Sequence, residues 1–181
     1  VAPRAGTGPT LRVVQVGAGL WGRSWAELVG AAPGYRLVGL VDSRRDARQW
    51  AGSRLGVPGF AKLRRALREA SPDVVLLVSP PATHRRLAEE ALAAGAHVIV
   101  EKPLALDLAD ATAIADAADR HGRHVVVSQN YRFRRQARAL EALVREHAVG
   151  DLLGVRVVFG FDFRCAWVTS RHWLGQMRHP F

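Results

Sequence analysis

The sequence predicts an α/β protein with a doubly wound parallel sheet, because strand-like and helix-like segments alternate along most of its length. The strand-like segments are short continuous apolar runs, such as residues 74–78 (VVLLV). Continuous runs are typical of strands that are buried on both faces. Beyond about residue 130 this alternation stops, which predicts the beginning of an α+β domain with an open, mostly antiparallel sheet.

The elements of the first part follow one another with short connections. Strands are predicted at 11–16, 36–41, 73–78, 97–101 and 124–128. Helices are predicted at 20–31, 44–55, 61–70, 83–94 and 108–121. Gly95 and Gly122 are expected to end helices, and Asp107 to cap the helix that begins at Leu108. Right-handed β-α-β units of this kind bind ligands at the carboxyl ends of their strands.

Two elements are predicted beyond residue 130. A helix is expected over 134–147, because Leu140, Leu143 and Val144 share one face. A long strand is expected over 152–163, and these two elements are too few to close a second core.

Composition limits the class of protein. The chain has 181 residues, of which 23% are charged, as in globular proteins. No stretch approaches the roughly 18 consecutive apolar residues of a membrane span, and residues 1–10 lack an apolar signal core, so cytoplasm is the expected location. The single cysteine, Cys165, excludes an internal disulfide and any multi-cysteine metal site. His172 and His179 have no third ligand at a convincing spacing, so no metal is expected.

The formal net charge of +10 comes almost entirely from arginine, since Lys62 and Lys102 are the only lysines. The arginines are scattered at spacings that suit the solvated faces of successive helices, which favours codon bias over selection for a polyanion partner. Such a charge still strengthens non-specific nucleic-acid binding at low salt. No specific nucleic-acid partner is expected.

A glycine-rich turn joins the first strand to the first helix. Gly17, Gly19 and Gly22 form a G-x-G-x-x-G pattern that also contains Leu20 and Trp21. The first glycine permits the tight turn, the second lets the backbone approach a pyrophosphate, and the third lets helix and strand pack closely. The helix presents unpaired N–H groups and its positive dipole end to the phosphates. The pattern predicts a dinucleotide site in a Rossmann-type doubly wound sheet.

Asp42 ends the second strand, 20 positions after Gly22. A carboxylate there accepts hydrogen bonds from both adenosine ribose hydroxyls and repels a 2′-phosphate, which favours NAD. Ser43, Arg44 and Arg45 complicate this expectation, because nearby arginines can hold that phosphate. NAD is the expected cofactor, and NADP or dual use stays open.

Three further clusters follow strand ends. They are Ser79-Pro80-Pro81-Ala82-Thr83-His84, Glu101-Lys102-Pro103 and Gln129-Asn130-Tyr131-Arg132-Phe133. Together with the glycine turn, they resemble the glucose–fructose oxidoreductase / inositol dehydrogenase family (Gfo/Idh/MocA) over about residues 10–181. The combination is far more specific than any one part. The resemblance implies oxidation or reduction of sugars, polyols and related compounds with NAD or NADP.

The same resemblance implies two domains: an NAD(P)-binding Rossmann domain, 10–130, and the incomplete start of a C-terminal substrate and oligomerisation domain, 131–181. The second domain of the family is an α/β domain with a large, mostly antiparallel sheet. Members tend to oligomerise through that sheet, so a homo-oligomer is expected of the full-length protein. The expected partner is a small-molecule sugar or polyol substrate.

The resemblance assigns Lys102 a catalytic or substrate-orienting role and also places it among the cofactor contacts. A lysine at the mouth of a nucleotide cleft can hydrogen-bond a substrate hydroxyl and stabilise the oxygen as the proton leaves and the hydride departs. The alternative is a solvated strand-end lysine. Glu101 is expected to orient Lys102 or to meet the cofactor at its ribose or nicotinamide end, and a simple ion pair is the alternative.

The remaining cofactor contacts are also implied by the resemblance. Ser79, Pro80 and Pro81 resemble the segment that lies along the cofactor, where prolines give a stiff wall. His84 is expected either to touch cofactor or substrate or to make a local hydrogen bond early in a helix. Asn130 resembles a family residue that lines the cleft between the domains, with a structural turn as the alternative.

The resemblance further implies an Asp-x-x-x-His motif in the second domain, whose histidine is the usual acid/base partner of Lys102. It is expected after a segment much like 173–181, where this sequence stops. Neither His172 nor His179 follows an aspartate by four residues. The chain is therefore expected to be a fragment or a truncated product that binds cofactor with little or no dehydrogenase activity. The alternative is a non-catalytic dinucleotide-binding protein with a redox-sensing or structural role.

Overall fold

The computed structural model describes residues 8–158. The chain divides into two units, Val1–Gln129 and Asn130–Phe181. Among the described residues, the first unit holds the sheet and most of the helices.

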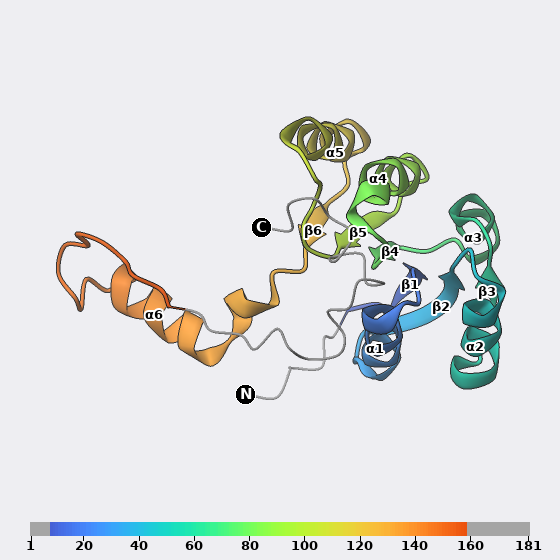
Figure 1. Ribbon diagram of the computed structural model, residues 1–181, viewed down its shortest axis with the longest axis horizontal. Coiled ribbons are helices and arrows are strands. Elements are labelled where there is room, and N and C mark those ends of the chain that lie inside the picture. Colours follow the sequence, from blue (N-terminus) through green and yellow to red (C-terminus); the bar gives the residue numbers. More distant parts are fainter. Residues whose placement is uncertain (1–7, 159–181) are drawn as a thin grey trace. The chain divides into compact units, whose positions relative to one another are not determined.

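A six-stranded sheet forms the centre of the first unit, with the strand order β3-β2-β1-β4-β5-β6 (Figure 1). The strands are β1 (Leu11–Val16), β2 (Tyr35–Val41), β3 (Gly59–Phe60), β4 (Val74–Leu77), β5 (His97–Val100) and β6 (Val125–Val127). All neighbouring strands run parallel. The chain order reverses between β1 and β4, and ligands of open α/β sheets bind at such a switch point.

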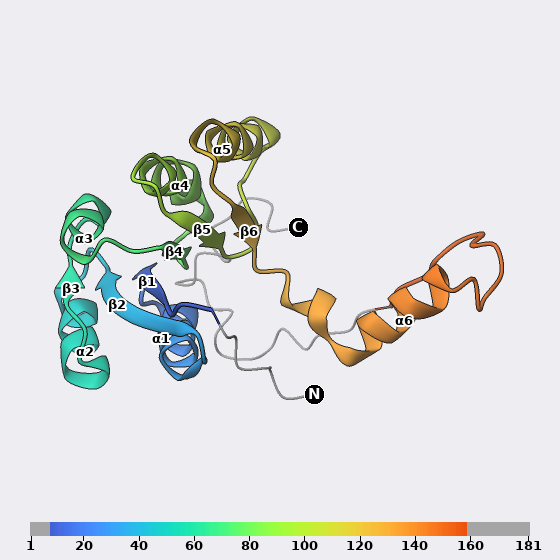
Figure 2. The ribbon, with the colours of Figure 1, turned by 180° about the vertical axis from the view of Figure 1, so that it is seen from behind.

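Helices cover both faces of the sheet, as Figures 1 and 2 show. The helices of one face are α1 (Leu20–Ala31) and α2 (Arg45–Leu55), and those of the other are α3 (Leu63–Ala70), α4 (His84–Ala93) and α5 (Leu108–His121). Because successive strand residues point to opposite faces, Leu76 packs with α1 and α2, whereas Val75 and Leu77 pack with the other three helices. The predicted doubly wound parallel sheet is confirmed.

The predicted helix ends are also present. The Asp107 carboxylate caps α5, since its Oδ1 accepts a hydrogen bond of 2.8 Å from the backbone N–H of Asp110. Gly122 ends the same helix in the left-handed region, with φ at 59°. Gly95 does so after α4 with φ at 86°, and Ala96 N–H then bonds to the carbonyl of Ala91.

Two short elements of the first unit differ from the prediction. The strand β3 has only two residues, too few to leave an apolar pattern, and it is absent from the predicted set. It pairs with β2, where Gly39 leaves room for the ring of Phe60: a Cβ on that glycine would lie 2.7 Å from Phe60 Cε2. A 3-10 turn, η1 (Pro81–Thr83), precedes α4, so that helix begins at His84.

The second unit is described over residues 130–158 and contains a 3-10 turn, η2 (Asn130–Phe133), and one helix, α6 (Arg135–Arg145). The helix is shorter than predicted because His147 takes a φ of 52°. Ala148 N–H then bonds back to the carbonyl of Leu143 at 3.0 Å, which closes the helix end.

The predicted strand over 152–163 is not formed over 152–158, which carry no regular secondary structure. A strand needs a hydrogen-bonded neighbour, and in the described part of the chain no strand pairs with these residues. Residues 159–163 lie outside the described part. Among residues 8–158, no helix combines the length and apolar character required to cross a membrane.

Candidate functional site

The glycine turn lies at the carboxyl end of β1, beside the end of β4. Gly17 has a φ of 97°, and a Cβ on it would lie 2.5 Å from the carbonyl oxygen of Val78. A Cβ on Gly22 would overlap the carbonyl oxygen of Gly17. The backbone itself therefore requires glycine at both positions.

Gly19 differs from the other two glycines because a Cβ on it would meet no atom within 4 Å. It is the N-cap of α1 and contributes no side-chain cap, so the first-turn N–H groups have no side-chain acceptor from it. Leu20 is the first residue of α1, and the Trp21 side chain is exposed. Folding does not require glycine at position 19, whereas the close approach of a pyrophosphate does.

Gln15 braces the glycine turn from inside and was not among the predicted site residues. Its side chain is fully buried, and Nε2 donates to the carbonyls of Gly17 at 2.8 Å and Gly22 at 2.6 Å. Within residues 8–158, Oε1 has no hydrogen-bond partner. A single amide group thus fixes both ends of the turn. The available signal in the sequence was a polar residue within the apolar run of residues 13–16.

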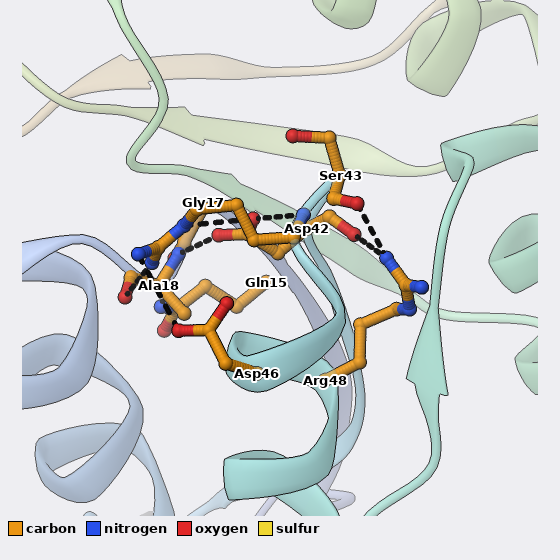
Figure 3. A network of polar contacts seen from close by, with 8 residues as sticks. Gln15, Gly17, Ala18, Asp42, Ser43, Asp46 and Arg48 are labelled. Atoms are coloured by element: carbon orange, nitrogen blue, oxygen red, sulfur yellow. Dashed lines mark hydrogen bonds and ion pairs between the residues drawn. The ribbon is translucent and has the colours of Figure 1, made fainter.

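Asp42 joins the glycine turn to the loop after β2 (Figure 3). Its Oδ2 accepts from Ala18 N–H and its Oδ1 from Arg44 N–H, both at 2.9 Å. The side chain is only 11% exposed. A carboxylate offers about four acceptor sites, so two remain for ribose hydroxyls. Asp42 is thus placed both to hold the turn and to meet a ligand.

Two arginines shape the loop after Asp42. The Arg44 guanidinium donates from Nη2 to the carbonyl of Ala18 at 3.2 Å, and its Nε lies 3.6 Å from the Asp42 carboxylate. Arg48 donates from Nη1 to the carbonyls of Asp42 at 2.8 Å and of the exposed Ser43 at 2.6 Å (Figure 3). The cationic group beside the carboxylate is therefore already engaged with the turn, and Arg48, which was not predicted, fixes the backbone.

The loop after β4 is held by its own hydroxyls. Ser79 Oγ and Thr83 Oγ1 share a hydrogen bond of 2.7 Å, and Thr83 Oγ1 also donates to the carbonyl of Pro80 at 2.7 Å. Pro81 is buried and begins the 3-10 turn. The loop is therefore rigid at the switch point, where a cofactor would lie along it.

His84 is fully buried, and both ring nitrogens face backbone carbonyls. Nε2 lies 2.8 Å from the oxygen of Ser79, while Nδ1 lies 3.1 Å from that of Pro103 and 3.2 Å from that of Leu104. These contacts agree with the alternative that His84 makes local hydrogen bonds. They also reach a second loop, the one that follows β5. The ring links the loops that follow β4 and β5.

The loop after β5 carries Glu101 and Lys102. The carboxylate accepts from the indole N–H of Trp25 at 2.8 Å and from the backbone N–H of Lys102 at 3.0 Å. Lys102 is exposed, and among residues 8–158 its ammonium makes no hydrogen bond or ion pair. Glu101 therefore contacts the backbone of Lys102 rather than its charge. Trp25 was not predicted, because its partner is 76 positions away in the sequence.

Asn130 begins η2 in the second unit, and its part in a cofactor site stays a prediction. In the part of the chain that is described, no group of three or more His, Cys, Asp and Glu side chains suits a metal ion. Cys165, His172 and His179 lie outside that part.

Helix-surface arginines pair with nearby carboxylates. A hydrogen bond with Glu69 raises the pKa of Arg65, and hydrogen bonds with Asp110 and Glu89 raise the pKa of Arg85. Both guanidinium groups therefore stay charged. These contacts match the solvated helix faces expected from the arginine spacing.

A tight glycine turn at the switch point, an uncapped helix start and an acidic residue at the end of β2 define a dinucleotide-binding protein of the doubly wound class. Residues 11–129, more than half of the chain, match the oxidoreductase family with an NAD-binding Rossmann fold, GFO_IDH_MocA. The chain belongs to this family.

Three proteins illustrate how similar this chain is to known proteins and how much of each protein it covers. D-apiose dehydrogenase of Paraburkholderia graminis is 31% identical over 153 residues, which cover 82% of this chain and 40% of that protein. A glycosyl hydrolase family 109 protein of Streptomyces coelicolor is 29% identical over 154 residues, or 80% of this chain and 33% of that protein. The crystal structure of scyllo-inositol dehydrogenase from Lactobacillus casei, with bound cofactor NAD(H) and scyllo-inositol, superposes with a TM-score of 0.74 at 28% identity, over 78% of this chain and 43% of that one. The chain spans less than half the length of each.

Proposed function

We propose that the first unit binds NAD at the carboxyl edge of its sheet and forms the cofactor half of an oxidoreductase for sugars, polyols or related hydroxyl and carbonyl compounds. The observation that carries this proposal is the asymmetry of the three glycines. Gly17 and Gly22 are required by packing, whereas Gly19 faces open space above the start of α1. A ligand that approaches the backbone closely accounts for a glycine at the middle position, where no packing contact requires one.

Different residues around the turn would contact different parts of the cofactor. The N–H groups that begin α1 would hold the pyrophosphate, the free acceptor sites of Asp42 the adenosine ribose, and the rigid loop from Ser79 to Pro81 the nicotinamide end. His84 supports that loop rather than touching the cofactor, because its ring is fully buried against backbone carbonyls. A role of Asn130 in cofactor binding stays a prediction.

Lys102 is the proposed catalytic residue. Bound NAD would accept a hydride from the carbon that carries the substrate hydroxyl. The Lys102 side chain, exposed and without a partner in residues 8–158, would contact the cofactor and hydrogen-bond that hydroxyl oxygen. It would stabilise the oxygen as the proton passes to the acid/base histidine that the family resemblance implies. Glu101 would fix the backbone from which this side chain extends.

NAD is proposed over NADP for an electrostatic reason. The Asp42 carboxylate opposes a 2′-phosphate, and the Arg44 guanidinium already contacts Asp42, the Ala18 carbonyl and Asp46. A 2′-phosphate would therefore compete with existing contacts for Arg44, the cation that pairs with the carboxylate.

The rest of the proposal concerns the longer protein. Residues 131–181 would begin the substrate and oligomerisation domain, and a homo-oligomer in the cytoplasm without a specific nucleic-acid partner is the proposed state. The names of the relatives, which include a sugar dehydrogenase and a polyol dehydrogenase, support the substrate class.

Thermal unfolding with each dinucleotide tests the proposal. At about 100 times its Kd, a ligand stabilises the folded state by about 2.7 kcal/mol, so NAD is expected to raise the unfolding midpoint by several degrees. NADP is expected to do so less at equal concentration, because of the Asp42 charge. Lys102→Ala should keep the NAD shift, as should the control Lys62→Ala at the other lysine. The absence of a shift with both dinucleotides would refute the proposed function.

A further inference from the structure

The segment 101–104 is tied to side chains from helices on opposite faces of the sheet. Trp25 belongs to α1 on one face, and His84 begins α4 on the other. We propose that Trp25 and His84 are positioning residues that together brace the backbone on both sides of Lys102. This inference rests on the proposed role of Lys102.

The first anchor acts through Glu101. The indole N–H of Trp25 donates to Oε1 of Glu101 at 2.8 Å, and Oε2 of the same carboxylate accepts the backbone N–H of Lys102 at 3.0 Å. Trp25 itself packs against the core beneath α1 and α2, so the anchor does not move freely. Both carboxylate oxygens are thus used to connect α1 with the backbone of Lys102. Hydrogen bonds to an ionised carboxylate are among the stronger ones in proteins.

The second anchor acts on the residues after Lys102. His84 Nδ1 lies 3.1 Å from the Pro103 oxygen and 3.2 Å from the Leu104 oxygen. Nε2 lies 2.8 Å from the Ser79 oxygen, so the ring also holds the loop at the switch point. A neutral ring donates to one of these two sides and an imidazolium to both. In either form the buried ring fixes the spacing between the loops after β4 and β5.

The brace has a functional consequence because a lysine side chain is long and flexible. With the backbone held on both sides, only the side-chain rotamers of Lys102 remain to be ordered when a ligand binds. The helix that holds Trp25 also begins at the glycine turn, so the proposed pyrophosphate site and the Lys102 backbone share one rigid element. Loss of either anchor should misplace the ammonium without removing the dinucleotide site.

Trace acetylation of the 181-residue chain tests this inference, because Lys62 and Lys102 are its only lysines. Peptide mass spectrometry would give the labelling rate of each lysine with and without NADH, and the exposed Lys62 serves as the internal reference. NADH at about 100 times its Kd leaves about one per cent of the chain free, so labelling of Lys102 should fall by about tenfold or more relative to Lys62.

Three variants separate positioning from general stability. Trp25→Phe removes the indole N–H together with the five-membered ring that carries it, and His84→Leu removes both ring nitrogens. Because loss of one hydrogen bond changes an equilibrium by about fivefold, the protection of Lys102 should fall by about that factor in Trp25→Phe and by at least that factor in His84→Leu. The Kd for NADH should change by about twofold at most. His84→Gln, which keeps an amide donor, should restore part of the protection.

Arg12→Met is the matched control. Like His84, the Arg12 side chain bonds two backbone carbonyls, those of Ala70 at 2.6 Å and Ser71 at 3.2 Å, at the end of α3. Arg12 lies near the start of β1, at the opposite end of the strand from the glycine turn. It should lower the unfolding midpoint and leave the protection of Lys102 unchanged.

The possible results are distinct. If NADH binds the parent chain without protecting Lys102, the proposed role of Lys102 fails and the brace fails with it. If the parent is protected and Trp25→Phe is protected to the same degree, only the brace is overturned, whether or not His84→Leu folds. Equal loss of protection in Arg12→Met would also overturn it, since stability alone would then explain the effect.

Discussion

Gly17→Ala is expected to destabilise the first unit by about 3 kcal/mol or more and to abolish dinucleotide binding. A residue with a side chain is strained by about 1–3 kcal/mol at the φ of 97° found here, and its Cβ would lie 2.5 Å from the Val78 carbonyl oxygen. That carbonyl cannot retreat easily, because Val78 N–H is bonded to the carbonyl of Val16 at 2.8 Å in the centre of the sheet. Urea unfolding followed by circular dichroism measures the loss.

Gly30→Ala is the control for this prediction. Gly30 lies near the end of α1, where a Cβ would meet no atom within 4 Å. Alanine there should be neutral or stabilising by about 0.5–1 kcal/mol, because glycine is a poor helix former. The strain argument is wrong if Gly17→Ala and Gly30→Ala unfold at the same urea concentration.

Asp42→Ala is expected to have the second-largest effect, on both stability and cofactor choice. It removes the acceptor of two backbone N–H groups, and Ala18, which carries one of them, is buried. Hydrogen bonds to a charged group contribute about 1.5–3 kcal/mol each, so a loss of about 2–3 kcal/mol is expected after partial hydration of the exposed N–H. The NAD affinity should fall by about tenfold or more, because the ribose loses its acceptor. The NADP affinity should fall less, since the repulsion is also removed.

The neighbouring acid supplies the control. Asp46 pairs with Arg44 at 3.5 Å on the surface, and its side chain is 65% exposed. Exposed pairs contribute about 0–1 kcal/mol, so Asp46→Ala should change neither stability nor the ratio of NAD to NADP affinity appreciably. A preference for NAD that survives Asp42→Ala unchanged would mean that another residue selects the cofactor.

The strands and helices of the first unit are visible in the sequence because each leaves a local signal. The bounds of α1 and α5 coincide with prediction, since a glycine turn precedes one and a capping aspartate the other. The two-residue strand β3 leaves no such signal. Its place beside β2 depends on Gly39, whose missing side chain leaves room for the ring of Phe60. The segment 152–158 has an apolar pattern but no pairing strand among the described residues, and pattern alone does not form a ladder.

Candidate site residues could be predicted from the sequence where a single residue supplies the chemistry. They could not be predicted where the role depends on a contact between two distant residues. The glycines, Asp42 and Lys102 are recognisable from the strand ends that they follow. The roles of Gln15, Trp25 and Arg48 depend on where other backbone segments pass, as with Trp25 and Glu101, 76 positions apart. Such contacts become visible only when the sheet brings those segments to one edge.

Isothermal titration calorimetry with NAD, run on the 181-residue chain and on its Gly19→Val variant, tests most directly whether the glycine turn is a dinucleotide site. The added side chain meets no protein atom within 4 Å at its Cβ, so the variant should fold with a stability within about 1 kcal/mol of the parent. The parent is expected to bind one NAD saturably, and Gly19→Val to bind at least about tenfold more weakly, because its side chain occupies the place of the pyrophosphate. Equal affinity in the two proteins, or no saturable binding to the parent, would contradict the proposed site.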